Sequence, residues 1–214
     1  YRAAAHVGGD YYDFMEISTE EYGLIVSDVA GKGVPASLMM IMIRTLFKSL
    51  MRSGVSDPAK VLTLINSTLA PDIGEGRFAT LLFGAFNRKK RLFRYANAGY
   101  GPILIYRAAE GVCAFINSPG QSIPIGIMPD ITFEEEKPLR LKKGDMLLLF
   151  TDGIYEARNK DGEEYGMDRL AEVVRDVSGR KSAEIANRVV KSVLSFTGEV
   201  EQQDDMTLLV MKVN

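Results

Sequence analysis

The 214-residue sequence predicts an α+β fold whose sheets are mainly antiparallel. Segments with strand character and segments with helix character occur in runs: strands, two helices, many strands, two helices and a last strand. The strict alternation of strand and helix that builds parallel sheets is absent. The length suits one large domain, and the sequence has neither an internal repeat nor a low-complexity linker. We therefore expect residues 1–214 to form a single domain.

The first third of the chain contains two expected strands and two expected helices. The strands are YYDFMEI and EYGLIVSD, the second being an apolar run that ends at Asp28. A helix is expected over residues 35–52, because proline suits a first turn and apolar residues then recur at helical spacing. Its first half, SLMMIMI, is apolar nearly all round, which predicts that this end is buried. Asp57 is a good N-cap for a second helix that begins at Pro58.

The remainder is expected to be rich in strands, followed by two helices and a final strand. The expected strands are FATLLFGAFN, RLFRYANAG, ILIYRA, VCAFIN, ITFEEE and DMLLLFTD. Between the first two, the basic run at 88–91 is interpreted as a solvated hairpin turn. Helices are expected near residues 167–177 and 182–196, and MTLLVMKV closes the chain.

Composition bounds the class of protein. Hydrophobic residues make up 46% and charged residues 25%, as in ordinary globular domains, and a net charge of −2 gives no argument for nucleic acid. The single cysteine, Cys113, excludes an internal disulfide and favours a reducing, cytoplasmic compartment; we expect it to be a buried, inert thiol on a strand. The most apolar run, at 38–43, is far shorter than the about 18 residues of a spanning helix, so no signal peptide or transmembrane segment is expected. The opening YRAAAHVGGD reads like mid-protein sequence, and we expect an upstream regulatory domain.

Aspartates stand beside glycines at the ends of the expected strands. Asp10 follows two glycines, Asp28 precedes the loop GKG, and Asp152 precedes Gly153. Asp204 and Asp205 come directly before the final strand. Carboxylates placed in this way can point into a common cleft while the backbone approaches closely.

Such a set of oxygen ligands favours magnesium or manganese. Histidine and cysteine occur once each, which argues against a zinc site, whereas carboxylates suit hard cations. Two such ions about 3.5–4 Å apart can activate a bridging water and orient a phosphate, so metal-assisted phosphoester hydrolysis is one interpretation. The alternative is that each aspartate is a turn, cap or loop residue. The GKG loop lacks the spacing of a phosphate-binding P-loop.

The motifs together resemble a known family. VGGDYYDF, VSDVAGKGVPASLMM, ANAGYGPILIY, IPIGI, GDMLLLFTDGIYEARN and DDMTLLVMKV occur in this order along the whole chain. The combination resembles the bacterial PP2C-like (PPM family) serine/threonine phosphatase domains of the RsbU and SpoIIE type. The resemblance implies a four-layer α-β-β-α sandwich, in which two antiparallel sheets are flanked by helix pairs.

The resemblance also implies two Mn²⁺ or Mg²⁺ ions and assigns their ligands. Asp28 matches the bridging carboxylate, Asp10 another ligand, and the carbonyl of Val29 a backbone ligand. Asp152 and Asp204 match ligands of the second metal, with Asp205 as a further candidate beside them. Three glycines are expected near the site: Gly9, Gly31 and Gly153. Gly153 would let the chain turn close to the metals. Glu156 falls within a matching motif, where a structural role is favoured over direct ligation.

The sequence departs from the family pattern in two places. Many relatives carry a histidine where this chain has Tyr100. The arginine that holds substrate phosphate in eukaryotic members has no counterpart in AAAHVGGD, so metals, bound water or another residue would hold the phosphate. His6, the only histidine, could act as a general acid, but a packing or hydrogen-bonding role is favoured.

The function implied by the resemblance is that of a metal-dependent protein serine/threonine phosphatase. Its expected substrate is a phosphorylated STAS-domain antagonist of an anti-sigma factor, within partner-switching control of transcription or stress responses. Two rivals stay open: a catalytically weak binding module and a phosphoesterase for a small molecule. A shift of the helix at 35–52, driven by an upstream sensor, would move Asp28 and change metal occupancy. A homodimer is left open.

Overall fold

The computed structural model describes residues 1–4, 7–74, 76–117 and 123–214. These residues group into two compact units. The N-terminal unit comprises the described residues within 6–100 and 118–140, and the C-terminal unit comprises those within 1–5, 101–117 and 141–214. Each unit is one antiparallel sheet with its own helices. The expectation of a single domain stays a prediction.

The N-terminal unit is built on a five-stranded sheet with the order β1-β2-β3-β4-β7. Its strands are β1 (Tyr11–Ser18), β2 (Glu21–Val29), β3 (Ala79–Asn87), β4 (Leu92–Ala98) and β7 (Leu139–Arg140). All of its neighbouring strands pair antiparallel. The predicted basic turn connects β3 to β4, and Arg91 there adopts a φ of 50°.

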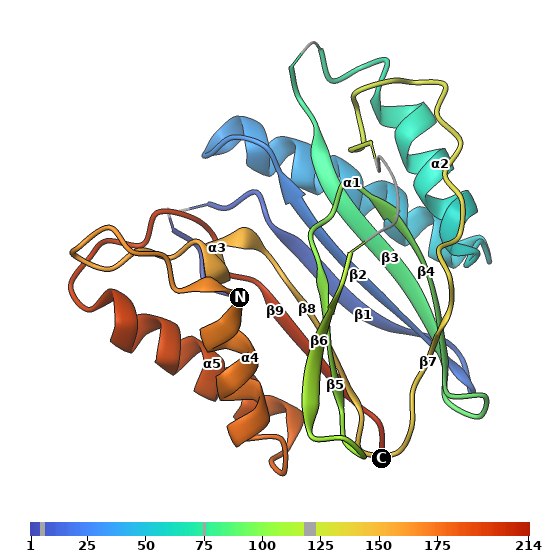
Figure 1. The fold of residues 1–214 in the computed structure, drawn as a ribbon. Helices are drawn as coiled ribbons and strands as arrows, with labels where there is room; N and C mark the ends of the chain where they lie inside the picture. Colours follow the sequence, from blue (N-terminus) through green and yellow to red (C-terminus); the bar gives the residue numbers. More distant parts are fainter. Residues whose placement is uncertain (5–6, 75, 118–122) are drawn as a thin grey trace. The chain divides into compact units, whose positions relative to one another are not determined.

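Two helices, α1 (Val34–Arg52) and α2 (Pro58–Leu69), cover one face of this sheet (Figure 1). Both predicted helices are confirmed, and Asp57 caps α2 as expected, with its Oδ1 accepting a hydrogen bond from the Lys60 N–H at 2.9 Å. The core between helices and sheet is apolar and includes Ile43, Phe47, Leu62 and Phe83.

The predicted burial of the first half of α1 holds for one side of the helix only, where Ser37, Met39 and Ile43 are buried. Leu38, Ile41 and Met42 are exposed, with 58% of Leu38 accessible to solvent, because the sheet covers only one side of the helix. By length and composition alone, α1 is also apolar enough to cross a membrane, which the short apolar run at 38–43 did not predict. This observation carries little weight by itself, because a helix packed on the core of a folded domain passes the same test.

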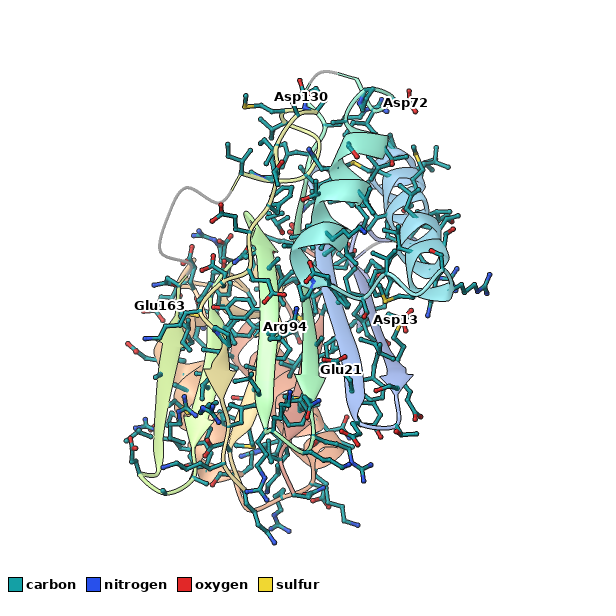
Figure 2. The ribbon with its side chains drawn as sticks, turned by 90° about the vertical axis from the view of Figure 1, so that its right-hand side faces the viewer. Asp13, Glu21, Asp72, Arg94, Asp130 and Glu163 are labelled. Atoms are coloured by element: carbon teal, nitrogen blue, oxygen red, sulfur yellow. The ribbon has the colours of Figure 1, made fainter. Side chains whose placement is uncertain are left out.

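The segment ITFEEE is not a strand, contrary to expectation. Within it only Glu135 forms a bridge, with Ala96, and the short β7 follows. Its partner is distant in sequence: the Phe133 N–H donates to Thr63 Oγ1 of α2 at 3.0 Å instead of to a neighbouring strand. Arg94 on β4, labelled in Figure 2, holds this segment through an ion pair with Glu135.

The C-terminal unit is a four-stranded sheet with the order β6-β5-β8-β9. Its strands are β5 (Ile103–Arg107), β6 (Val112–Ile116), β8 (Met146–Phe150) and β9 (Leu208–Lys212), and its helices are α3 (Asp152–Tyr155), α4 (Gly166–Asp176) and α5 (Ser182–Thr197). Helices α4 and α5, both predicted, bury Leu170, Val174, Ile185 and Val189 against this sheet (Figure 1). The four-residue helix α3 was not predicted.

Cys113 lies on β6, as predicted, but is only half-buried. Its Sγ donates to the Ala171 carbonyl at 3.4 Å, and burial raises the pKa of the thiol. Since the thiolate is the reactive form, the expectation of an inert thiol agrees with these surroundings.

Candidate metal centre

In the N-terminal unit, antiparallel pairing brings Asp10 and Asp28 together. The register of β1 and β2 pairs Tyr11 with Ser27, so Asp10 and Asp28 are the next residues on the two facing chains. Asp10 is buried, with 6% exposure, and Asp28 is partly exposed. Two carboxylates this close repel unless a cation or hydrogen-bond donors compensate them.

The glycines before Asp10 let the backbone pass close to Val29. A Cβ added at Gly9 would lie 3.0 Å from the Val29 carbonyl oxygen and 3.3 Å from Ala36 Cβ. Ser37 in the first turn of α1 donates its hydroxyl to the Gly8 carbonyl at 2.9 Å. The helix is therefore bonded directly to the segment that carries Asp10.

The loop between Val29 and α1 turns at two glycines. Gly31 and Gly33 have φ angles of 95° and 74°, in the left-handed region that favours glycine. The Ala30 N–H donates to the Phe78 carbonyl at 3.0 Å and fixes the start of this loop. Gly31 thus shapes the loop that follows Asp28. Its expected place near a metal site stays a prediction.

In the C-terminal unit, the residues around Asp152 run beside the backbone of Asp204 and Asp205. β8 pairs Phe150 with Leu208, and the Thr151 N–H donates to the Thr207 carbonyl at 3.1 Å, which extends this ladder by one residue. A Cβ on Gly153 would lie 2.0 Å from the Asp205 carbonyl oxygen. Only glycine fits at this approach, as the sequence indicated.

Asp204 and Asp205 have different surroundings although they are adjacent. The Asp204 carboxylate is partly exposed, and its Oδ1 accepts the Asp205 N–H at 2.9 Å. The Asp205 carboxylate is buried, with 7% exposure, and accepts the Ala4 N–H at 2.9 Å and the Tyr1 hydroxyl at 3.4 Å.

Glu156 follows the short helix α3 and lies in the field of both predicted ligands of this unit. Burial raises the pKa of Glu156, and the negative charges of Asp152, Glu164 and Asp204 raise it further, while Arg158 lowers it. A local excess of negative charge of this kind favours the binding of a cation.

Two other sequence expectations have different outcomes. Tyr100 is buried just after β4, and its N–H donates to Asn97 Oδ1 at 2.8 Å while its carbonyl accepts from Asn97 Nδ2 at 3.1 Å. These bonds describe a structural role for its backbone. His6 lies outside the described residues.

The donor chemistry fits magnesium or manganese in each unit. In the described part of the chain, no three His, Cys, Asp or Glu residues gather closely enough to hold a metal as one group. The N-terminal unit instead has Asp10 and Asp28 near the Val29 carbonyl, and the C-terminal unit has Asp152 and Asp204 near the close approach of Gly153 to Asp205. This fits Mg²⁺, which keeps several waters and takes one or two carboxylates from the protein.

Sequence reasoning missed two residues that fix these aspartates. Thr151 is buried and its Oγ1 donates to the Asp205 carbonyl at 3.3 Å, and Ser37 holds Gly8. The sequence shows that each acidic motif has a hydroxyl residue close to it. It does not show which carbonyl that hydroxyl bonds to.

Comparisons with known proteins identify the family. The family model described as stage II sporulation protein E (SpoIIE) matches residues 18–214. The chain is 30% identical over 209 residues to the phosphoserine phosphatase RsbU of Bacillus subtilis, and the match covers 98% of the chain and 60% of that relative. The chain thus spans about three fifths of the length of RsbU.

Solved structures agree over the same range. The SiaA-PP2C domain of Pseudomonas aeruginosa superposes with a TM-score of 0.84 at 24% identity, covering 100% of this chain and 84% of that domain. A Mycobacterium tuberculosis structure of RsbU and RsbW domains gives a TM-score of 0.80 at 24% identity, covering 97% of this chain and 56% of that chain. These matches confirm the predicted PP2C-like α+β fold. The chain belongs to the SpoIIE family of PP2C-like phosphatase domains.

Proposed function

We propose that this chain is a metal-dependent phosphatase that hydrolyses phosphoserine or phosphothreonine in proteins. The observation that carries the proposal is that each unit gathers carboxylates at the end of an antiparallel strand pair. Asp10 faces Asp28, and Asp152 precedes Gly153, which packs against the backbone of Asp204 and Asp205. The relative RsbU is named a phosphoserine phosphatase, which supports the same reaction class.

Each unit would supply ligands for metal. Asp10, Asp28 and the Val29 carbonyl would hold metal on the N-terminal unit, and Asp152 and Asp204 on the C-terminal unit. Two bound Mn²⁺ or Mg²⁺ ions would supply a water of lowered pKa and neutralise charge on the phosphoryl group. That water would attack phosphorus in line, the P–O bond to the seryl or threonyl oxygen would break, and that oxygen would leave with a proton from the water. The aspartates would hold the metals and would not attack phosphorus, so no phosphoenzyme is expected.

A phosphorylated STAS-domain protein is the proposed substrate, in a partner-switching circuit that controls a sigma factor and so a stress response. The support is that RsbU and RsbW domains occur together in the similar structure from Mycobacterium tuberculosis. A cytoplasmic location is proposed with it, on the single half-buried cysteine.

We further propose that an upstream regulatory segment acts through α1. The support is that Leu38, Ile41 and Met42 are exposed on this helix, while Ser37 bonds its first turn to Gly8. A displacement of α1 would shift Asp10 and the loop after Asp28. The test is to attach the natural upstream segment and measure Mn²⁺ affinity in each signalling state; an unchanged affinity would contradict this proposal.

The test of the main proposal is a Mn²⁺-dependent assay on a phosphoserine STAS protein. We expect turnover by the wild type and a loss of at least about 100-fold in Asp28→Ala and Asp152→Ala, because each removes a metal ligand. Asp176→Ala, at the exposed end of α4, is the matched control and should retain full activity. Full activity in both ligand variants would refute the site.

The same assay separates the rivals. Hydrolysis of a nucleotide or sugar phosphate in preference to the phosphoprotein would favour a small-molecule phosphoesterase. A folded wild type that is inactive with both Mn²⁺ and Mg²⁺ would favour a binding module.

A further inference from the structure

Asp205 and its neighbour Asp204 are both acidic, but their side chains serve different parts of the molecule. Both carboxylate oxygens of Asp205 accept hydrogen bonds from the first residues of the chain: Oδ1 from the Ala4 N–H at 2.9 Å and Oδ2 from the Tyr1 hydroxyl at 3.4 Å. The residue is buried. Its side chain therefore faces residues 1–4, which belong to the C-terminal unit. These four residues are called the N-terminal segment.

The backbone beside Asp205 is bonded to the same segment. Met206 and Arg2 exchange two backbone hydrogen bonds, each 2.9 Å long. The Gln202 side chain donates to the Arg2 carbonyl at 2.9 Å and to the Asp204 carbonyl at 2.7 Å. The N-terminal segment thus runs as an extra short pairing partner along residues 202–206.

On its other side, this loop is fixed to the segment of Asp152. Thr151 Oγ1 donates to the Asp205 carbonyl at 3.3 Å and accepts the Thr207 N–H at 3.0 Å. Gly153 packs against the same Asp205 carbonyl, with no room for a Cβ. Asp205 is therefore a junction between the N-terminal segment and the strand end that carries Asp152.

The position of the Asp204 carboxylate depends on this junction. Asp204 Oδ1 accepts the N–H of Asp205 at 2.9 Å, so the orientation of the Asp205 backbone sets where the Asp204 oxygens lie. That backbone is held on one side by the N-terminal segment and on the other by Thr151, so these bonds contribute to the position of the Asp204 carboxylate. Groups that orient a metal ligand in this way commonly change metal affinity 10- to 100-fold when they are removed, by rough magnitude.

We propose that Asp205 is a positioning residue and not a metal ligand: it ties the N-terminal segment to the loop of Asp204 and so holds Asp204 and Asp152 in place for metal binding. The inference rests on the proposed metal-dependent function, since it concerns the same ligands. It assigns the two adjacent aspartates separate roles, ligand for Asp204 and tether for Asp205.

Substitution by asparagine separates a tether from a ligand. An asparagine at 205 keeps an oxygen to accept the Ala4 N–H, and its amide can donate to the Tyr1 hydroxyl, which also has acceptor lone pairs. A neutral amide is a poorer ligand than a carboxylate for a hard cation. A tether thus survives Asp205→Asn and fails in Asp205→Ala, whereas a ligand is impaired in both.

The experiment is calorimetric titration of Mn²⁺ into the metal-free 214-residue chain, with thermal unfolding in EDTA measured in parallel. We expect Asp204→Asn to lose the binding step, Asp205→Ala to weaken it about tenfold and Asp205→Asn to stay within about threefold of wild type. Turnover of Asp205→Ala should recover at saturating Mn²⁺. An Asp205→Asn variant as impaired as Asp204→Asn would overturn the proposal, and so would an unimpaired Asp205→Ala.

A second variant tests the tether without touching either aspartate. Ala4→Pro removes the N–H that Asp205 accepts, and we expect it to weaken Mn²⁺ binding by a similar factor. Ala3→Pro, which leaves the Ala4 N–H in place, is its control. Equal affinities for the two proline variants would contradict the tether even if Asp205→Ala fails to fold.

The readout is metal binding, so a failure of the proposed function is distinguishable. If wild type binds Mn²⁺ but hydrolyses no phosphoprotein, the substrate proposal fails while the tether is still measured. If wild type binds no Mn²⁺ at all, both the metal centre and the tether are refuted.

Discussion

Ser37 Oγ lies 2.9 Å from the carbonyl oxygen of Gly8, so the first turn of α1 is hydrogen-bonded to the segment that carries Asp10. The same hydroxyl lies 3.0 Å from the Gly33 carbonyl. Ser37 is buried, and this bond joins the helix to a predicted metal-ligand segment without any charged group.

Removal of this hydroxyl should cost stability and metal affinity together. Ser37→Ala leaves the Gly8 carbonyl without this donor, and we expect a loss of about 1–3 kcal/mol in the free energy of unfolding. Urea unfolding of the metal-free chain measures it, and Mn²⁺ titration should show weaker binding. Ser49→Ala, exposed on the same helix, is the control and should change stability by less than about 0.5 kcal/mol.

Gly153→Ala should disrupt the Asp204–Asp205 loop. The added Cβ would lie 2.0 Å from the Asp205 carbonyl oxygen, so one of the two segments must move. We expect activity to fall by more than about tenfold, since a shift of about 1 Å at a site can cost 100-fold. Gly179→Ala, where a Cβ meets open space, should be tolerated; equal activities in the two variants would contradict the close approach.

Asn66 holds the loop that contains IPIGI. Its side chain, 0% exposed, accepts the Gly126 N–H at 2.9 Å and donates to the Met128 carbonyl at 2.8 Å. Asn66→Ala leaves both backbone groups without their buried partner, and we expect about 2–3 kcal/mol of destabilisation in chemical unfolding. Ser67→Ala, on the exposed side of α2, should cost much less.

Asp145 should make the C-terminal unit sensitive to acid. Burial alone would raise the pKa of Asp145, but the Lys142 and Ala108 N–H groups and the Arg107 guanidinium lower it further than burial raises it. A depressed pKa in the folded state adds stability above the unfolded value of about 3.9, and this is lost as pH falls through the folded value.

The free energy of unfolding, measured at a series of pH values from about 2 to about 6, would show this loss, because that range spans the carboxyl pKa. Asp145→Asn should be less stable near neutral pH and should have a shallower slope at low pH. Identical slopes for the variant and wild type would exclude Asp145 as the source.

Local chemistry was readable in the sequence where a single residue decides the outcome. The Asp57–Pro58 pair fixed the start of α2, and the glycine before Asp10 and after Asp152 indicated close backbone approach. The match of these motifs to the family also predicted the fold, which the comparisons confirm.

The failures have a common physical cause, which is that partners distant in sequence decide the structure. SLMMIMI is apolar all round, yet the core covers one side of α1 and leaves Leu38 exposed. ITFEEE has strand character, yet the Phe133 N–H of this segment donates to the Thr63 hydroxyl and not to a strand. The family resemblance assigned Asp204 as a ligand and left Asp205 as a further candidate, and the hydrogen bonds of the N-terminal segment to Asp205 could not be read from the sequence.

The hydrogen bonds of residues 1–4 bear on how this protein should be handled in the laboratory. Whatever is joined ahead of Tyr1, whether an affinity tag or a natural upstream segment, connects directly to the pairing of Arg2 with Met206, two residues from Asp204. Metal affinities measured with a tag at this position are therefore expected to differ from those of the untagged chain.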